Sequence, residues 1–199
     1  MPHFRFNLPL AWMRCTAICS GVWLVTTAAL ASAPEARLLL DASREAGRVN
    51  LLIRTTVDAP YSVIWAVLTD YNNTAKWVPG MERSVVLKRR PGGAIVEQSG
   101  QANVLFFHLA INSVVDVQEL PPDRIEVKLV RGDFKRLDGA YELKKLGNTD
   151  ERYELRWQGQ LELSAAVPGF VAQPLLANNL KKSFEGLVQE MERRARAAP

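Results

Sequence analysis

The central part of the chain is a series of apolar-rich β segments separated by short turns, and this pattern most limits the folds open to it. The turns contain Pro91-Gly92-Gly93, Pro121-Pro122-Asp123 and Gly147-Asn148-Thr149-Asp150, all of them residues typical of tight turns. Connections this short join antiparallel neighbours, because parallel strands need a crossover of about a dozen residues or more. The predicted strands are Arg83 to Arg90, Ala94 to Phe107, His108 to Leu120, Arg124 to Phe134, Leu137 to Lys145 and Arg152 to Leu163.

One more strand and two short helices are predicted before this series. Apolar and polar residues alternate from 49 to 57, which indicates a strand with one buried face. Asp58-Ala59-Pro60 then ends the strand and begins a helix that runs to about Thr69. A second short helix or turn follows from Asp70 to Trp77, and Pro79-Gly80 ends it.

The C-terminal segment that follows Val167-Pro168-Gly169 has the apolar spacing of a long amphipathic helix. The last predicted strand also has one apolar face, which carries Tyr153, Leu155 and Trp157. The apolar residues of the helix, at steps of three and four, are Leu176, Leu180, Phe184, Leu187, Val188 and Met191. We expect an α+β fold in which a curved antiparallel sheet of about seven strands wraps around this helix. One helix does not fill such a sheet, so a cavity of roughly 300 to 1,000 Å³ is expected between them.

The first 31 residues have the order of features of a secretory signal peptide. Arg5 and Arg14 precede a mostly apolar stretch from Cys15 to Ala31 that ends in small residues. Cleavage is expected after Ala31, with Ala33 as a second possible position and a retained membrane anchor as the alternative. Residues 32–46 are predicted to be a linker or a short helix, and residues 47–197 to be the ligand-binding domain. We therefore expect a secreted protein, periplasmic in a double-membraned bacterium.

Composition after such a cleavage excludes several classes of site. Both cysteines, Cys15 and Cys19, lie in the leader, so disulfides and cysteine metal sites are excluded, and His108 is the one remaining histidine. We predict no catalytic residues, no metal and no cofactor. Loss of Arg5 and Arg14 lowers the formal charge from +4 to +2, which is too small an excess to indicate nucleic-acid binding. The sequence does not indicate an oligomeric state.

Several motifs identify a family resemblance over about residues 47–195. Val57-Asp58-Ala59-Pro60, then Ile64-Trp65-Ala66-Val67-Leu68-Thr69-Asp70-Tyr71, and Trp77-Val78-Pro79-Gly80-Met81 resemble the START-like (SRPBCC) superfamily. Within it they resemble the polyketide cyclase/dehydrase and coenzyme Q-binding group, as do Arg131-Gly132-Asp133-Phe134 and Leu137-Asp138-Gly139-Ala140-Tyr141. The resemblance implies the helix-grip fold with an internal pocket for a lipid, a quinone or an aromatic molecule. Members that catalyse cyclisation are a minority, so an aromatase/cyclase-type enzyme is the alternative function.

The predicted ligand-binding residues are the large apolar and aromatic side chains on the faces that would enclose the pocket. Large aromatic residues serve both as core and as pocket lining, so lining and filling are both open for Tyr153 and Trp157. The predicted set is Trp77, Met81, Phe106, Phe134, Tyr141, Tyr153, Trp157, Phe170, Leu176, Leu180 and Phe184.

Two other segments each have two possible roles. Trp77-Val78-Pro79-Gly80 is either a gate at the pocket mouth or a turn whose Trp packs on the core. Val167, Phe170 and Val171 belong to an uncharged segment that either touches a membrane transiently or packs under the sheet.

The roles of several charged and titratable residues also have two interpretations. Arg131, Asp133, Lys135 and Arg136 either orient a polar head group or form a solvated hairpin tip. His108 is either a general base or a structural residue. Glu97 is a candidate buried acid, but the strand parity around it does not place its side chain.

Overall fold

The computed structural model describes residues 38–104, 107–164 and 167–197. The predicted leader, Phe106 and Ala165-Ala166 lie outside the described residues. Two α-helices, a 3₁₀ helix and eight strands form one unit, and its curved sheet with a long C-terminal helix confirms the expected α+β class. Their bounds are β1 Leu38–Glu45, β2 Arg48–Asp58, α1 Tyr61–Leu68, η1 Tyr71–Lys76, β3 Met81–Arg90, β4 Gly93–Val104, β5 Phe107–Leu120, β6 Arg124–Gly132, β7 Phe134–Lys145, β8 Arg152–Leu163 and α2 Gly169–Ala197.

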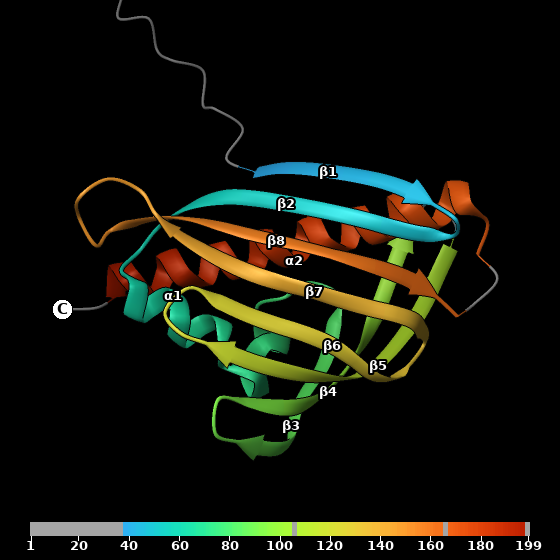
Figure 1. The fold of residues 1–199 in the computed structure, drawn as a ribbon, viewed down its shortest axis with the longest axis horizontal. Coiled ribbons are helices and arrows are strands. Elements are labelled where there is room, and N and C mark those ends of the chain that lie inside the picture. Colours follow the sequence, from blue (N-terminus) through green and yellow to red (C-terminus); the bar gives the residue numbers. More distant parts are fainter. Residues whose placement is uncertain (1–37, 105–106, 165–166, 198–199) are drawn as a thin grey trace, which may run out of the picture. The chain divides into compact units, whose positions relative to one another are not determined.

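The sheet is an antiparallel meander with the strand order β1-β2-β8-β7-β6-β5-β4-β3. Figure 1 shows the strands in this order. From β3 to β8 each strand pairs with its neighbour in sequence, as the short turns predicted. β2 then pairs with β8 along the whole strand, from Val49 opposite Leu161 to Asp58 opposite Arg152. This pairing brings the two ends of the domain into one sheet.

An eighth strand, β1, corrects the expectation of a linker or short helix in residues 32–46. Leu38–Glu45 pairs with β2 from Leu38 opposite Thr55 to Glu45 opposite Arg48. Its side chains alternate between half-buried and exposed, and Leu39 faces outward with 52% of its surface exposed. Because three successive leucines hide this alternation, the sequence pattern did not indicate a strand.

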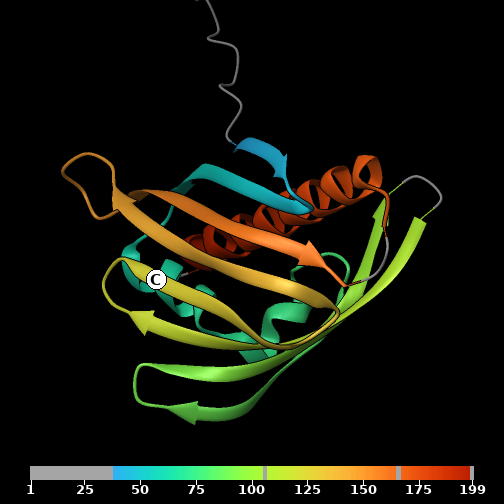
Figure 2. The same ribbon diagram turned by 45° about the vertical axis from the view of Figure 1, so that its right-hand side comes forward.

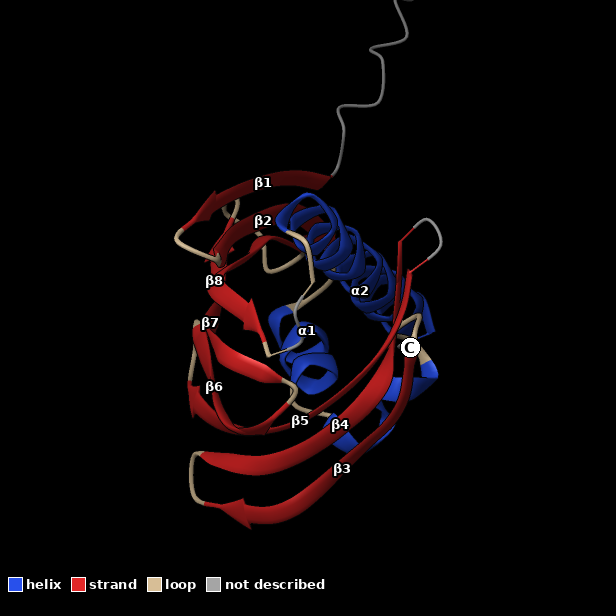
Figure 3. Cartoon of the chain, turned by 90° about the vertical axis from the view of Figure 1, so that its right-hand side faces the viewer, coloured by secondary structure: helices blue, strands red, loops and turns tan. Residues whose placement is uncertain are grey.

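Helix α2 lies on the concave side of the sheet. Figure 2 shows α2 running behind β2 and β8, and in Figure 3 the sheet curves around the helices from β1 to β3. The buried side chains of α2 include Leu175, Leu176, Phe184, Leu187 and Met191, and Phe184 and Met191 have no exposed surface. The side chains of α2 therefore form the centre of the hydrophobic core. Among the helices of the described residues, none combines the length and apolar content that crossing a membrane requires.

The C-terminal half of α2 is joined to Asp70, the residue before η1, by a charge network centred on the buried Glu190. Glu190 is 8% exposed and accepts hydrogen bonds from Arg193 Nε at 2.7 Å and from Arg194 Nε at 2.7 Å. The hydrogen bonds from Arg193, which have the larger effect, and from Arg194 lower the pKa of Glu190 to about 2. Arg194 also donates to Asp70 Oδ2 at 3.0 Å and lies over the Trp77 ring, 4.8 Å from its centroid. The segment between α1 and β3 is thus fixed to the helix.

Candidate functional site: an uncharged cavity

A cavity of about 270 Å³ lies between the sheet and the helices. It is slightly smaller than the expected range, and three large rings, those of Phe134, Tyr141 and Trp157, form part of its wall. α1, η1, the 78–81 segment, strands β4 to β8 and one face of α2 contribute to its wall. The cavity therefore lies where the curved sheet and the single long helix leave space between them.

Most of the wall is apolar, and strand alternation explains which side chains reach it. On β5 the lining residues are Ile111, Ser113, Val115 and Val117, every second residue of the strand. The apolar and aromatic lining residues are Val67, Leu68, Tyr71, Val78, Pro79, Met81, Ile111, Val115, Val117, Ile125, Val127, Phe134, Leu137, Tyr141, Trp157, Leu161, Leu176, Leu180 and Leu187.

The polar part of the wall carries no charge. Among the described lining residues none is Asp, Glu, Lys, Arg, His or Cys. Beside the two tyrosines, Tyr71 and Tyr141, the polar lining residues with side chains are Thr74, Gln98, Ser99, Gln101, Ser113, Asn179 and Ser183. Hydroxyl and amide groups can orient a neutral polar group, but they do not neutralise an ion.

Tyr71 of η1 is the more constrained of the two tyrosines. It is 6% exposed, and its hydroxyl donates to Glu119 Oε1 at 2.9 Å. Glu119 is held in turn by Arg89 Nη1 at 2.8 Å, and the Arg89 guanidinium lies 5.2 Å from the Tyr71 ring centroid. Burial, and then the Glu119 carboxylate, raise the pKa of Tyr71 well above its usual range. The proton of Tyr71 is thus committed to Glu119, which does not line the cavity.

Tyr141 of β7 has its ring fixed while its hydroxyl has no protein partner. The ring stacks on Phe184 with centroids 5.9 Å apart and planes 17° apart. Within the described residues the hydroxyl makes no hydrogen bond, and burial alone raises the pKa of Tyr141 to about 12. A neutral hydroxyl that lines a cavity in a fixed orientation is a donor available to a guest.

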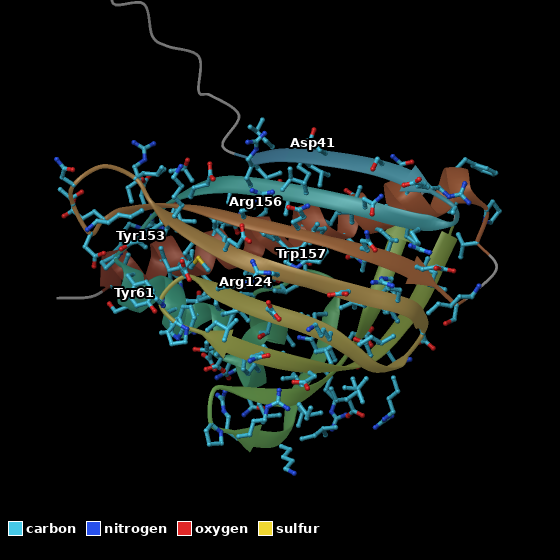
Figure 4. The ribbon with its side chains drawn as sticks, in the orientation of Figure 1. Asp41, Tyr61, Arg124, Tyr153, Arg156 and Trp157 are labelled. Atoms are coloured by element: carbon cyan, nitrogen blue, oxygen red, sulfur yellow. The ribbon has the colours of Figure 1, made fainter. Side chains whose placement is uncertain are left out.

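Trp157 of β8 forms part of the cavity wall and lies over two glycines. Figure 4 shows it near the middle of β8, beside Arg156. A Cβ atom on Gly139 would lie 2.5 Å from Trp157 Cζ2, and one on Gly159 would lie 2.6 Å from Trp157 Cη2. The indole therefore rests directly on the backbone of the paired residues Gly139 and Gly159.

Six of the predicted site residues line the cavity. They come from the 78–81 segment and β3, from β7, from β8 and from α2, so the structure brings together residues up to about a hundred positions apart. These six are Met81, Phe134, Tyr141, Trp157, Leu176 and Leu180.

Four of the predicted site residues lie elsewhere, and these expectations are corrected. Phe184 is fully buried behind Tyr141, and Trp77 lies under Arg194, although its neighbours Val78, Pro79 and Gly80 line the cavity. Tyr153 is buried beside Tyr61 with ring centroids 6.3 Å apart, at the α1 end of the sheet (Figure 4), and donates to Asp150. Phe170 is 81% exposed at the start of α2. Phe106 lies outside the described residues.

The other candidates are also placed by the structure. Asp133 accepts from the Asn112 backbone N–H at 2.8 Å, and Lys135 and Arg136 pair with Glu162 and Asp138 on the surface, as in a solvated hairpin. Glu97 pairs with the exposed Arg83 and is not a buried acid. The side chain of His108 lies outside the part of the structure that is described.

Sequence reasoning missed Tyr71 and most of the polar wall, including Gln98, Ser113 and Asn179. Tyr71 was counted only as part of a helix motif. Ser113 shares strand parity with Ile111, Val115 and Val117, and this parity was the signal that could have placed it inside.

Comparison with known proteins agrees with this geometry. The model of a family described as polyketide cyclase / dehydrase and lipid transport matches residues 57–184. No curated protein matches the chain.

Three solved structures resemble the fold. The Zhui aromatase/cyclase from Streptomyces sp. R1128 aligns with a TM-score of 0.65 and 19% identity over 75% of this chain and 97% of that chain. A START superfamily protein from Mycobacterium smegmatis aligns with a TM-score of 0.57 and 18% identity over 74% and 97%. A STAR-related lipid transfer protein from Xanthomonas axonopodis aligns with a TM-score of 0.58 and 13% identity over 76% and 98%. At these identities the likeness shows the START-like fold and leaves the ligand open.

Proposed function

Because the chain belongs to the polyketide cyclase / dehydrase and lipid transport family, we propose that it binds and carries a hydrophobic small molecule, without catalysis, in this cavity. The observation that carries the proposal is the wall itself, which is mainly apolar and, in its described residues, uncharged. Affinity would come from apolar burial at about 25 cal/mol per Å² of surface removed from water. A lipid, a quinone or an aromatic compound would suit such a wall.

An aromatase/cyclase-type enzyme is the second candidate, and the two tyrosine hydroxyls favour it. Tyr71 and Tyr141 both line the cavity. Positioned tyrosines can assist proton transfer to a chain folded in the cavity. The carrier is preferred because Tyr71 already shares its proton with Glu119 and both pKa values are raised away from neutrality.

Native mass spectrometry of the protein purified from its own cells tests the carrier. We expect a bound apolar molecule that is extracted unchanged, whereas an enzyme would release a product after incubation with a polyketide-like substrate. Leu180→Trp places an indole in the cavity and is expected to lower occupancy about tenfold. Leu87→Trp, on a 48% exposed residue of β3, is the matched control and keeps wild-type occupancy. Wild-type protein that never carries a guest would overturn the proposal.

Export and membrane contact complete the proposed role. We propose that residues 1–31 direct the chain to the periplasm and are removed, which the same intact-mass measurement reads directly. Phe170 is the most exposed of the large hydrophobic residues described and stands six residues before Leu176, or about 9 Å along the helix axis. Val167 is half-buried, and Val171 is 2% exposed, so Val171 is removed from the predicted contact.

Replacing Phe170 by Ser tests the membrane contact. Insertion of one phenylalanine contributes about 1.5–3 kcal/mol, so we expect binding to liposomes to fall about tenfold or more in co-sedimentation. Leu87→Ser removes another exposed apolar side chain, on β3, and is expected to bind as the wild type does. Equal co-sedimentation of the two variants would remove the contact from the proposal.

A further inference from the structure

The cavity makes a narrower prediction about its guest than hydrophobicity alone. A hydrophobic molecule with a carboxylate, phosphate or ammonium group needs an opposite charge, because an unpaired buried ion costs several kcal/mol. The described wall offers no such charge. Glu119, which accepts from the lining residue Tyr71, does not itself line the cavity and is already paired with Arg89.

Some hydrogen-bonding groups of the wall already have partners within the protein, and others do not. The Tyr71 hydroxyl already donates to Glu119, and the Ser183 hydroxyl donates to the Asn179 backbone carbonyl at 2.9 Å on its own helix. Gln101 donates to Glu82 at 2.8 Å. Within the described residues Tyr141 of β7 keeps an unused hydroxyl, on a ring that stacks on Phe184.

The position of Tyr141 also places this donor beside aromatic surface. Its neighbours across the sheet are Trp157 on β8 and Ile125 on β6, and both line the cavity. A flat apolar guest that lies against Trp157 would bring an edge substituent to the Tyr141 hydroxyl.

We propose that the guest is a neutral apolar molecule with a hydroxyl or carbonyl oxygen, and that Tyr141 donates the hydrogen bond that selects this oxygen. This inference rests on the proposed binding function and names the ligand class of the same cavity. It excludes fatty acids and other molecules that would bury an ionised group.

Three matched probes, naphthalene, 2-naphthol and 2-naphthoate, test the inference by titration of the purified protein at pH 7, followed by tryptophan fluorescence and calorimetry. We expect 2-naphthol to bind about three- to tenfold more tightly than naphthalene, the gain of one neutral hydrogen bond. The ionised 2-naphthoate should bind on the order of 100-fold more weakly than 2-naphthol.

Tyr141→Phe keeps the ring and removes the donor, so it should lower 2-naphthol affinity to that of naphthalene and leave naphthalene binding unchanged. Tyr61→Phe is the matched control, because Tyr61 of α1 does not line the cavity, and it should leave all three affinities unchanged. Should Tyr141→Phe not fold, the order of the three probes on the wild-type protein decides alone. Equal binding of the three probes, or an unchanged preference in Tyr141→Phe, overturns the inference and leaves the binding function standing. Failure of all three to bind overturns both.

Discussion

Phe184→Asp is expected to leave no folded domain. The side chain has no exposed surface and stacks on Tyr141 at the centre of the interface between α2 and the sheet. Losing a buried phenylalanine costs about 3–5 kcal/mol. An unpaired carboxylate at the same place costs several kcal/mol more. Together these approach or exceed the 5–15 kcal/mol, roughly, by which such domains are stable. Far-UV circular dichroism with urea denaturation measures the result.

Phe170→Asp is the matched control for this variant. It makes the same chemical change on the same helix, but at a side chain that is 81% exposed. We expect its free energy of unfolding to stay within about 0.5 kcal/mol of the wild-type value. Cooperative melting of Phe184→Asp near the wild-type temperature would contradict the packing described for α2.

Gly186→Val is expected to lower the free energy of unfolding by about 3 kcal/mol and to displace the 77–81 segment. A Cβ atom at this position would lie 2.1 Å from the Trp77 carbonyl oxygen and 2.9 Å from Pro79 Cδ. The first of these atoms is backbone, so the conflict cannot be relieved by a rotamer change. Since Val78, Pro79 and Met81 line the cavity, binding of 2-naphthol should fall together with stability.

Glu185→Val separates this clash from the helix propensity of valine. It introduces the same side chain one residue earlier in α2, at an exposed position. We expect a loss of stability of about 0.5 kcal/mol, which reflects the lower helix propensity of valine. Chemical denaturation of the pair measures the difference, and equal stabilities would show that α2 and the Trp77 segment are not in close contact.

The strands from β2 to β8 could be predicted within a few residues because turn residues bound most of them. The boundary between β4 and β5 has no turn residues, and it was placed after Phe107, whereas β4 ends at Val104 and β5 begins at Phe107. β7 begins at Phe134, three residues before the predicted start, since Phe134 already pairs with Leu163. β1 could not be predicted from alternation, because Leu39 is an apolar residue on its outward face. Its place depends on pairing with β2, which is a tertiary contact.

The site was predictable only where large apolar residues follow strand or helix parity. Trp157, Leu176 and Leu180 were found in this way, whereas Met81 was indicated by the family motif. Phe184 was assigned to the wall by the same rule, but its ring fills the layer behind Tyr141. Phe170 was predicted to line the pocket because it is hydrophobic, but at the start of the helix few neighbours cover it and it is exposed. The polar wall residue Asn179, unlike Ser113, carries no sign in the sequence that it faces inward.

The contact between Trp157 and the glycine pair Gly139–Gly159 means that substitutions at these positions would change the volume of the cavity. A methyl group on Gly139 would lie 2.5 Å from the indole and push the ring into the space that a guest would occupy, whereas one on Gly159 would also lie 2.5 Å from the Asp138 backbone carbonyl oxygen. Conversely, a smaller residue at position 157 would enlarge the cavity without altering any strand pairing. Guest size in this scaffold is therefore adjustable at Gly139 and Trp157, on two adjacent strands, independently of helix α2 on the other side of the cavity.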